Sequence, residues 1–343
     1  MRKNLTRFIQ KWDNNISIQQ LIRWSDQSLI LPFYHAIQAD ESLPHIQHLY
    51  PLRSVEQFEK DLDFFCQHFQ AIHLSDLIAF VQNGKALPEK AYFLSFDDGL
   101  KEVDTIIAPI LKRKGIPATF FLNADFVDNK NLFFRYKASL LINHIQRQAP
   151  SKKQVEKLLL RLANYDFPRK SLESILLKIS YQNRKVLDEI AIILGVDFSD
   201  FLDKQKPYLT TKQIQKLQLD GFTFGGHSVN HPLYSAISEE EQLRQTIESV
   251  DFVEQKFKVN YRSFAFPFTD DGIATSFFKK IELNQILDIS FGTAGLKEQS
   301  FPFHFQRIPM ELSKASASVQ MKTELSYFLI KKILGKNKVK YKG

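Results

Sequence analysis

Residues 91–122 read AYFLSFDDGLKEVDTIIAPILKRKGIPATFFL. The first six residues are apolar apart from one serine, and they lead into Asp97-Asp98-Gly99, which is typical of a buried strand that ends in a turn. Apolar residues at helical spacing follow over 103–114, and after a turn at 115–117 a second apolar run covers 118–122. A strand, a helix and a second strand in this order are typical of a parallel sheet. The segment therefore predicts an α/β fold.

Strand and helix signals continue on both sides of this unit. Upstream, residues 29–35 predict a short buried strand, and 54–70 predict an amphipathic helix that Ser54 caps. Downstream, residues 210–219 predict a helix. Three further strands are predicted at 222–224, 263–266 and 289–291. We assign residues 29–320 to one α/β domain.

One long segment interrupts the alternation. Residues 128–206 are rich in lysine and nearly free of strand signals, and helices are predicted over 131–148, 152–164 and 171–194. We expect a helical insertion at one rim of the sheet. Residues 1–28 are predicted to form an N-terminal helical extension, and residues 321–343 a C-terminal helix with a basic tail. The prediction of the N-terminal helix rests on the helical spacing of Leu5, Phe8, Ile9 and Trp12.

Composition narrows the class of protein. The chain has 343 residues, of which 44% are hydrophobic and 24% charged, and this is typical of a globular protein. A single cysteine, Cys66, excludes a disulfide within the chain and a cysteine metal cluster. No uninterrupted apolar run reaches about 18 residues, and no apolar run of a secretion signal follows the charged N-terminal residues. These patterns predict a cytoplasmic protein.

The formal net charge is +8, and part of it comes from the C-terminal tail. No nucleic-acid-binding signature accompanies the charge, so we expect no nucleic-acid partner. The tail lysines allow a solvated tail, or attraction to anionic lipid headgroups at the inner membrane face or to a phosphate-bearing substrate. Flotation with anionic and neutral liposomes separates these readings. The lysines are Lys331, Lys332, Lys336, Lys338, Lys340 and Lys342.

Polar residues that can carry chemistry follow the predicted strands. Asp97 and Asp98 are adjacent carboxylates, so one can bind a cation while the other handles protons. In GGHSVNHP, residues 225–232, His227 and His231 can converge on one cation if the segment makes a helical turn, and the glycines before them let the backbone approach a ligand. Each pattern alone is compatible with an Asp-Gly turn or a chance pair of histidines. Together they predict a site of two histidines and one carboxylate with open positions, which is typical of catalytic zinc.

These segments resemble motifs of the polysaccharide deacetylase family (carbohydrate esterase family four). Residues 96–99 (FDDG) are similar to the first motif, 227–232 (HSVNHP) to the second, 264–268 (FAFPF) to the third, and 33–35 (FYH) to the Tyr-His of the first strand. The resemblance implies a distorted (β/α) barrel of about seven strands. It also implies that Asp97 is the general base, that a divalent metal, usually zinc, is bound by Asp98, His227 and His231, and that the backbone N–H of Phe268 helps to hold the oxyanion.

Two departures from the family pattern leave positions open. Many members have arginine in the third motif, where Ala265 stands here, and Arg307 is the candidate that could orient Asp97 instead. The late motif that supplies a histidine as general acid has no clear match, and His304 is the nearest candidate.

The function that the resemblance implies is hydrolysis of the N-acetyl group of a sugar, for example in a cytoplasmic intermediate of surface-polysaccharide assembly. Two alternatives stay open: amide or imide hydrolysis on a small molecule that is not a sugar, and a binding protein that keeps the fold without turnover. Metal content and acetate release from N-acetylated sugars separate the three.

Overall fold

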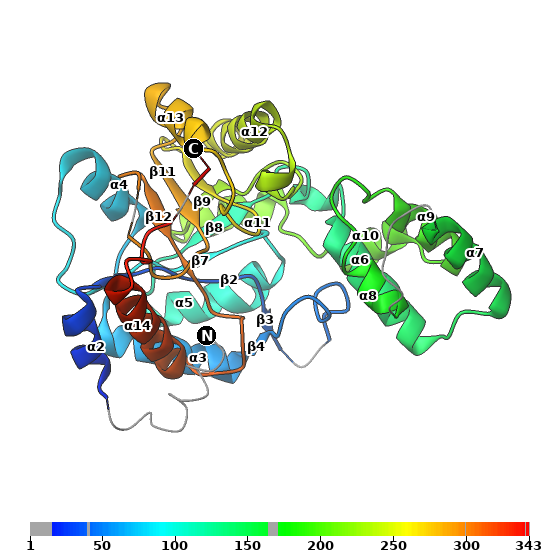
Figure 1. The fold of residues 1–343 in the computed structure, drawn as a ribbon, viewed down its shortest axis with the longest axis horizontal. Helices are drawn as coiled ribbons and strands as arrows, with labels where there is room; N and C mark the ends of the chain where they lie inside the picture. The colour runs from blue at the N-terminus through cyan, green and yellow to red at the C-terminus, as the bar shows by residue number, and fades with distance from the viewer. Residues whose placement is uncertain (1–15, 40–41, 164–170, 299, 340, 343) are drawn as a thin grey trace.

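The computed structural model describes residues 16–39, 42–163, 171–298, 300–339 and 341–342. Figure 1 shows a sheet surrounded by helices, with a separate group of helices, α6 to α10, on one side of it. The predicted N-terminal helix over Leu5 to Trp12 lies outside the described residues. Within them the first helix is α2, Ile18–Ser25.

The central sheet is parallel and its eight strands follow the order β12-β11-β10-β9-β8-β7-β2-β13. Their bounds are β2 Pro32–Tyr34, β7 Ser95–Phe96, β8 Thr119–Leu122, β9 Thr223–Gly226, β10 Ser263–Ala265, β11 Ile289–Gly292, β12 His304–Gln306 and β13 Ile308–Pro309.

The two ends of this sheet belong to one stretch of chain. β12 and β13 are separated only by Arg307; β12 pairs with β11, and β13 pairs with β2. Residues 304–309 therefore connect the two edges of the sheet and close it into a barrel. Because β12 and β13 together occupy one strand position, the eight strands fill seven positions around the barrel. The predicted distorted barrel of about seven strands is confirmed.

The apolar run at 91–96 forms two short strands that belong to different sheets, and not one continuous strand. Its first half, β6 (Ala91–Tyr92), pairs with β1 (Leu29–Ile30) and β5 (Gln70–Ala71) in a small sheet, whereas β7 pairs with β2 and β8 in the barrel. The predicted continuous strand was wrong in this detail, because the chain changes partners between Tyr92 and Ser95. A third sheet pairs β3 (Ile37–Gln38) with β4 (Arg53–Ser54).

Helices cover the outside of the barrel. Ser54 caps α3 as predicted, because its side chain accepts from the N–H of Gln57. The strand residues beneath the helices are Tyr34, Phe96, Phe120 and Phe224, which belong to one apolar core with the helices. The bounds are α3 Val55–His68, α4 Leu74–Asn83, η1 Val103–Ile107, α5 Ala108–Lys114, α11 Thr211–Leu219, η3 Tyr234–Ala236, α12 Glu239–Phe257, α13 Thr275–Leu283 and α14 Ala317–Ile333.

The segment between β8 and α11 is helical and has its own apolar core. Its elements are η2 Val127–Asn129, α6 Phe134–Arg147, α7 Lys152–Leu162, α8 Leu172–Leu176, α9 Val186–Leu194 and α10 Phe198–Gln205. The helix predicted over 171–194 was wrong, because α8 and α9 are separate. Between them lies the polar stretch 180–184, which the apolar periodicity on either side obscured.

The C-terminal residues dock on the barrel wall rather than extending into solvent. Helix α14 packs on α2 and α3. Beyond it the chain returns to α13, where the N–H of Lys342 donates to the carbonyl of Ile273 at 3.0 Å. The ring of Tyr341 lies 4.5 Å from that of Phe278. Within the described part of this tail the side chains of Lys332, Lys336, Lys338 and Lys342 remain exposed, as expected of a solvated tail, and Lys340 lies outside the described residues.

Within the described residues, no helix is both long enough and apolar enough to cross a membrane.

Candidate active site

Two adjacent aspartates follow β7 and turn away from each other. Asp98 and Gly99 both have left-handed backbone, with φ of 72° and 61°. This turn sends the two carboxylates in different directions, and it needs glycine at position 99, where a Cβ would lie 2.7 Å from Leu122. Asp97 stays in register with the sheet, because its N–H donates to Tyr34 at 3.0 Å.

Arg307 holds Asp97 from the barrel interior. Its guanidinium donates two parallel hydrogen bonds to the carboxylate, Nη1 to Oδ1 at 2.7 Å and Nη2 to Oδ2 at 2.8 Å. The guanidinium also lies 4.2 Å from the ring centre of Phe33, and it is fully buried. Burial is the largest single influence and would raise the pKa of Asp97, but the charge and hydrogen bonds of Arg307, together with the nearby His227 and His35, outweigh burial and keep that pKa below its usual value. The salt bridge expected in place of the third-motif arginine is formed.

The two histidines lie in the loop after β9. Ser228 and His231 both have positive φ, 67° and 61°, so the segment is a tight loop and not the helical turn considered from the spacing. The N–H of His231 donates to Ser228 Oγ at 3.0 Å, which fixes this loop.

The glycines before His227 serve packing rather than a ligand. A Cβ on Gly225 would lie 2.6 Å from the ring of Phe121, and one on Gly226 would lie 2.7 Å from Ser249 Oγ on α12. The expectation that these glycines let the backbone approach a ligand was wrong, because barrel packing already requires them.

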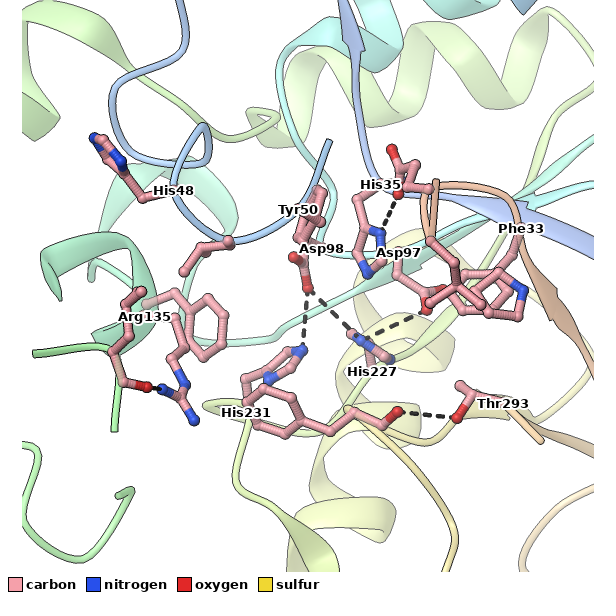
Figure 2. A pocket seen from close by; sticks show the side chains of 17 residues that line it. Phe33, His35, His48, Tyr50, Asp97, Asp98, Arg135, His227, His231 and Thr293 are labelled. Carbon is pink, nitrogen blue, oxygen red and sulfur yellow. Dashed lines mark hydrogen bonds and ion pairs between the residues drawn. The ribbon is translucent and has the colours of Figure 1, made fainter. Parts of the chain in front are cut away.

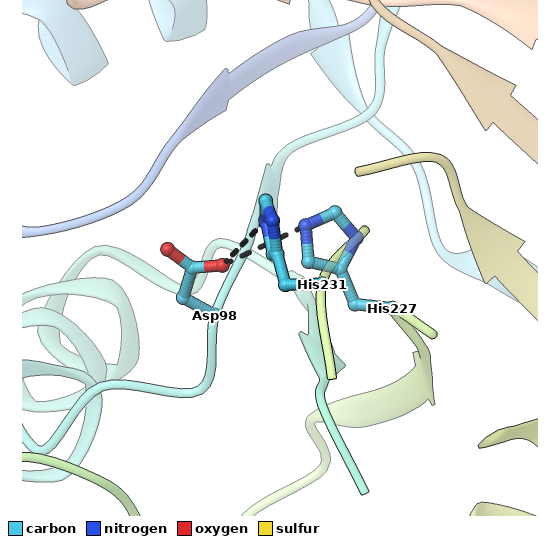
Figure 3. A group of neighbouring side chains, drawn as sticks. All are labelled: Asp98, His227 and His231. Atoms are coloured by element: carbon cyan, nitrogen blue, oxygen red, sulfur yellow. Dashed lines mark ion pairs between the residues drawn. The ribbon is translucent and has the colours of Figure 1, made fainter. Parts of the chain in front are cut away.

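Asp98, His227 and His231 converge as a possible metal centre (Figure 3). Asp98 Oδ1 lies 3.6 Å from Nε2 of His227 and 3.3 Å from Nε2 of His231. One ligand atom from each residue can be chosen so that all lie within 4.8 Å of one another, and all three side chains are buried. The phenol of Tyr136, on α6, donates to the other oxygen of Asp98 at 2.7 Å and orients the carboxylate.

The chemistry of these atoms fits a cation. Nδ1 of His227 donates to the carbonyl of Ala265 at 2.8 Å, and burial lowers the pKa of His227 to about 4. Near neutral pH its Nε2 therefore carries a lone pair that faces a carboxylate oxygen. Asp98 Oδ1 is buried, and among the described residues it has no hydrogen-bond partner. Electron-rich atoms placed in this way repel one another unless a cation lies between them.

A cavity of about 510 Å³ opens over this centre (Figure 2). That volume is within the usual range for small-molecule sites. Asp97, Asp98 and both histidines line the cavity together with Phe268. Phe268 has φ 58°, and its carbonyl accepts from Thr293 Oγ1 at 2.9 Å, which fixes the loop after β10. Among the described residues the N–H of Phe268 meets no acceptor, so it is free to donate to a ligand.

Residues 84–276 match the family model described as polysaccharide deacetylase. The matched range holds 276 − 84 + 1 = 193 of the 343 residues, more than half of the chain.

This chain belongs to the polysaccharide deacetylase family.

Solved structures with the same fold agree with this assignment. The Streptococcus pyogenes deacetylase PplD, solved with acetate, is 15% identical, with a TM-score of 0.54 over 86% of this chain and 97% of that chain. IcaB from Ammonifex degensii is also 15% identical, with a TM-score of 0.51 over 88% of this chain and 99% of that one. A de-N-acetylase from Aggregatibacter actinomycetemcomitans is 13% identical, with a TM-score of 0.52 over 85% and 98%. No curated protein matches the sequence significantly.

Members of the polysaccharide deacetylase family are carbohydrate esterases that act on the amide bonds of N-acetylated sugars, and the chain is a hydrolase of this class.

In this deacetylase His304 faces away from the cavity. Its two ring nitrogens lie 2.7 Å from Ser290 Oγ and 3.1 Å from Asp270 Oδ2, and the side chain is buried beneath α13. Ser290, Asp270 and the ring of Phe278 on α13 surround His304, and it does not line the cavity. The choice of His304 as general acid was wrong.

A different histidine, His35, lines the cavity. It follows β2, and its Nδ1 lies 2.5 Å from Oε2 of Glu311, which also accepts from the backbone N–H of His35 at 3.0 Å. Burial would lower the pKa of His35, but the charge and hydrogen bond of Glu311, together with the charges of Asp98 and Asp97, outweigh burial and raise that pKa to about 9. The ring stacks on Tyr50 with centres 4.5 Å apart.

The sequence analysis matched residues 33–35 to the first strand of the family but gave His35 no role. One signal could have found it, because His35 ends a predicted buried strand, as Asp97 does. Glu311 had no such signal, since it lies 276 residues away from His35 in the sequence.

Proposed function

We propose that this chain hydrolyses the N-acetyl group of an amino sugar, within a polysaccharide or a lipid-linked glycan intermediate, and that Asp98, His227 and His231 hold a divalent metal ion for the reaction. Two neutral imidazoles and one carboxylate are a ligand set that suits zinc. One observation carries the proposal: these three ligands meet beside a carboxylate, Asp97, that is held ionised in the wall of a cavity.

The reaction consumes one water molecule. Water oxygen bonds to the acetamide carbon, the carbon–nitrogen bond breaks, and acetate and a free amine are the products. The ion, when bound, would polarise the acetamide carbonyl and make water more acidic.

Asp97 would accept the proton of the attacking water. The bidentate contact with Arg307 orients this carboxylate and keeps it ionised. The free N–H of Phe268 would donate to the developing oxyanion, which is the kind of contact that is stronger in the transition state than in the substrate.

His35 would donate a proton to the leaving nitrogen. Glu311 raises its pKa and so keeps the ring protonated near neutral pH, and the ring lines the same cavity as Asp97. The pair thus fills the general-acid position for which the sequence offered no clear residue.

Side chains at the mouth of the cavity suit a sugar. Phe268 is 39% exposed and Leu312 is 57% exposed, and both line the cavity. Apolar groups beside converging polar groups are typical of small-ligand sites, and they can contact the carbon-bound hydrogens of a sugar ring.

Metal content and acetate release test the proposal. Purified protein should bind one equivalent of zinc and release acetate from at least one member of a panel of N-acetylated oligosaccharides. His231→Ala should reduce both strongly, whereas His144→Ala, on α6 outside the cavity, should change neither. A protein that cleaves only small amides that are not sugars, or that binds metal and sugar without turnover, would contradict the proposal. The cytoplasmic location and the contact with anionic membranes stay predictions.

A further inference from the structure

One cation at the cavity has no carboxylate partner. Three carboxylates line the cavity, and each has a role in the site itself. Asp97 pairs with Arg307, Glu311 pairs with His35, and Asp98 would be matched by the ion that it holds with the two histidines. Arg135 also lines the cavity, and it forms no ion pair with a described residue.

The Arg135 guanidinium uses only a small part of its hydrogen-bonding capacity. One nitrogen, Nη1, donates to the carbonyl of Leu177, and the group lies 5.3 Å and 5.8 Å from the ring centres of Phe134 and Phe268. A guanidinium carries five N–H donors, so most of them remain for a ligand. Contact with these aromatic rings leaves the N–H donors of the group unengaged.

The position of Arg135 separates it from the reacting groups. In Figure 2 it lies on the far side of Asp98 and His231 from His35 and Asp97, and its guanidinium turns toward Leu177 at the edge of the cavity. A sugar whose acetamide reaches Asp97 would therefore meet Arg135 with another part of its structure. His48 lines the same cavity, but burial lowers its pKa, so near neutral pH the positive charge on this side belongs to Arg135.

The helical insertion supplies this feature. Arg135 lies in the first turn of α6, and Phe133 and Leu177, which also line the cavity, come from the same insertion. The insertion thus adds a cationic wall to a site whose reacting groups all come from the barrel and the loops around it.

We propose that Arg135 binds an anionic group of the substrate, a carboxylate or a phosphate carried by the glycan near the N-acetylated sugar. This inference rests on the proposed function and narrows its substrate to acidic glycans. The planar fork of a guanidinium matches both anions, because each can accept two parallel hydrogen bonds.

Binding and turnover of two matched pairs of ligands test the proposal. The first pair is neutral tetra-N-acetylchitotetraose and a tetrasaccharide in which glucuronate alternates with N-acetylglucosamine; the second pair is N-acetylglucosamine and N-acetylglucosamine 6-phosphate. Each ligand is titrated into zinc-loaded protein, and acetate release is followed in parallel. At least one anionic ligand should bind more tightly than its neutral partner, and added salt should weaken that preference. The anion that shows the preference identifies its source as a uronate or a phosphate.

Variants assign the preference to Arg135. Arg135→Gln should reduce the affinity ratio of anionic to neutral ligand about tenfold or more, as expected for loss of hydrogen bonds to a charged group. Arg135→Lys should recover part of the ratio. Arg184→Gln is the matched control, because Arg184 also stacks on an aromatic ring, Tyr181, and donates to a backbone carbonyl, yet does not line the cavity.

The outcomes separate the two proposals. Equal weakening of neutral and anionic ligands in Arg135→Gln, or an unchanged ratio, would overturn the role of Arg135. Failure to release acetate from any ligand would count against the proposed function, whereas the affinity ratio would still decide whether Arg135 binds an anion.

Discussion

Two buried clusters of aspartate and histidine lie in the wall of this barrel. In the first, Asp98 with His227 and His231, a buried carboxylate oxygen has no hydrogen-bond partner among the described residues, and all three side chains line a cavity. In the second, Asp270 accepts from His304, Gln306 and Tyr341, and His304 also meets Ser290. The second cluster does not line the cavity.

The comparison teaches what distinguishes a reactive site from a structural one. Both clusters contain a buried aspartate beside buried histidine, so the presence of these residue types and their burial do not separate the two. In the second cluster the polar groups are hydrogen-bonded to one another and do not face the cavity. This cluster therefore has a structural role, because it links the barrel wall to the C-terminal segment. Unmatched ligand atoms that face a cavity make the first one able to bind and react.

The largest effect should follow from changing Asp97, which stands beside the first cluster. Asp97→Asn removes the proton acceptor and keeps the shape of the side chain, so kcat should fall by about 10²-fold or more. Zinc content should stay near one equivalent, because the three ligands are unchanged. Acetate release under saturating substrate measures kcat, and metal analysis of the same sample measures the zinc content. Undiminished turnover would remove Asp97 from the mechanism.

A smaller, pH-dependent effect should follow from Glu311→Gln. Of the carboxylates that raise the pKa of His35 to about 9, Glu311 contributes most, so removing its charge lowers that pKa. The general acid must be protonated to act, so activity is lost as the pH rises through its pKa. The alkaline limb of the kcat/KM profile should therefore shift to a lower pH by about one pH unit or more. The control Glu241→Gln, on α12 away from the cavity, should leave the limb in place. An unmoved limb in Glu311→Gln would show that His35 is not the acid.

The smallest effect on activity should come from the second cluster. Tyr341→Phe removes one hydrogen bond to Asp270 but keeps the ring packed on Phe278. The free energy of unfolding should fall by roughly 1 to 2 kcal/mol, while kcat and zinc content stay within about twofold of the unaltered protein. Denaturant titration and the acetate assay measure these quantities. A large loss of turnover without a loss of stability would mean that the two clusters act together.

The sequence by itself determined the parts of the protein that depend on local pattern. Apolar runs that end in Asp97-Asp98-Gly99 and in His227 predicted parallel strands with ligands at their ends, because strand and helix have different periods and chemistry gathers where strands stop. The same local order supported the family resemblance and the helical character of the insertion.

Tertiary structure decided what depends on distant segments meeting. Barrel closure brings residues 304–309 beside both β11 and β2, and only this places Arg307 against Asp97, 210 positions away in the sequence. It also pairs His35 with Glu311 and sets Arg135, from the insertion, at the cavity that the barrel residues form. Such contacts cannot be read from the periodicity of the sequence. The local pattern around each residue predicts the element that carries it, but not the distant residue that it will contact.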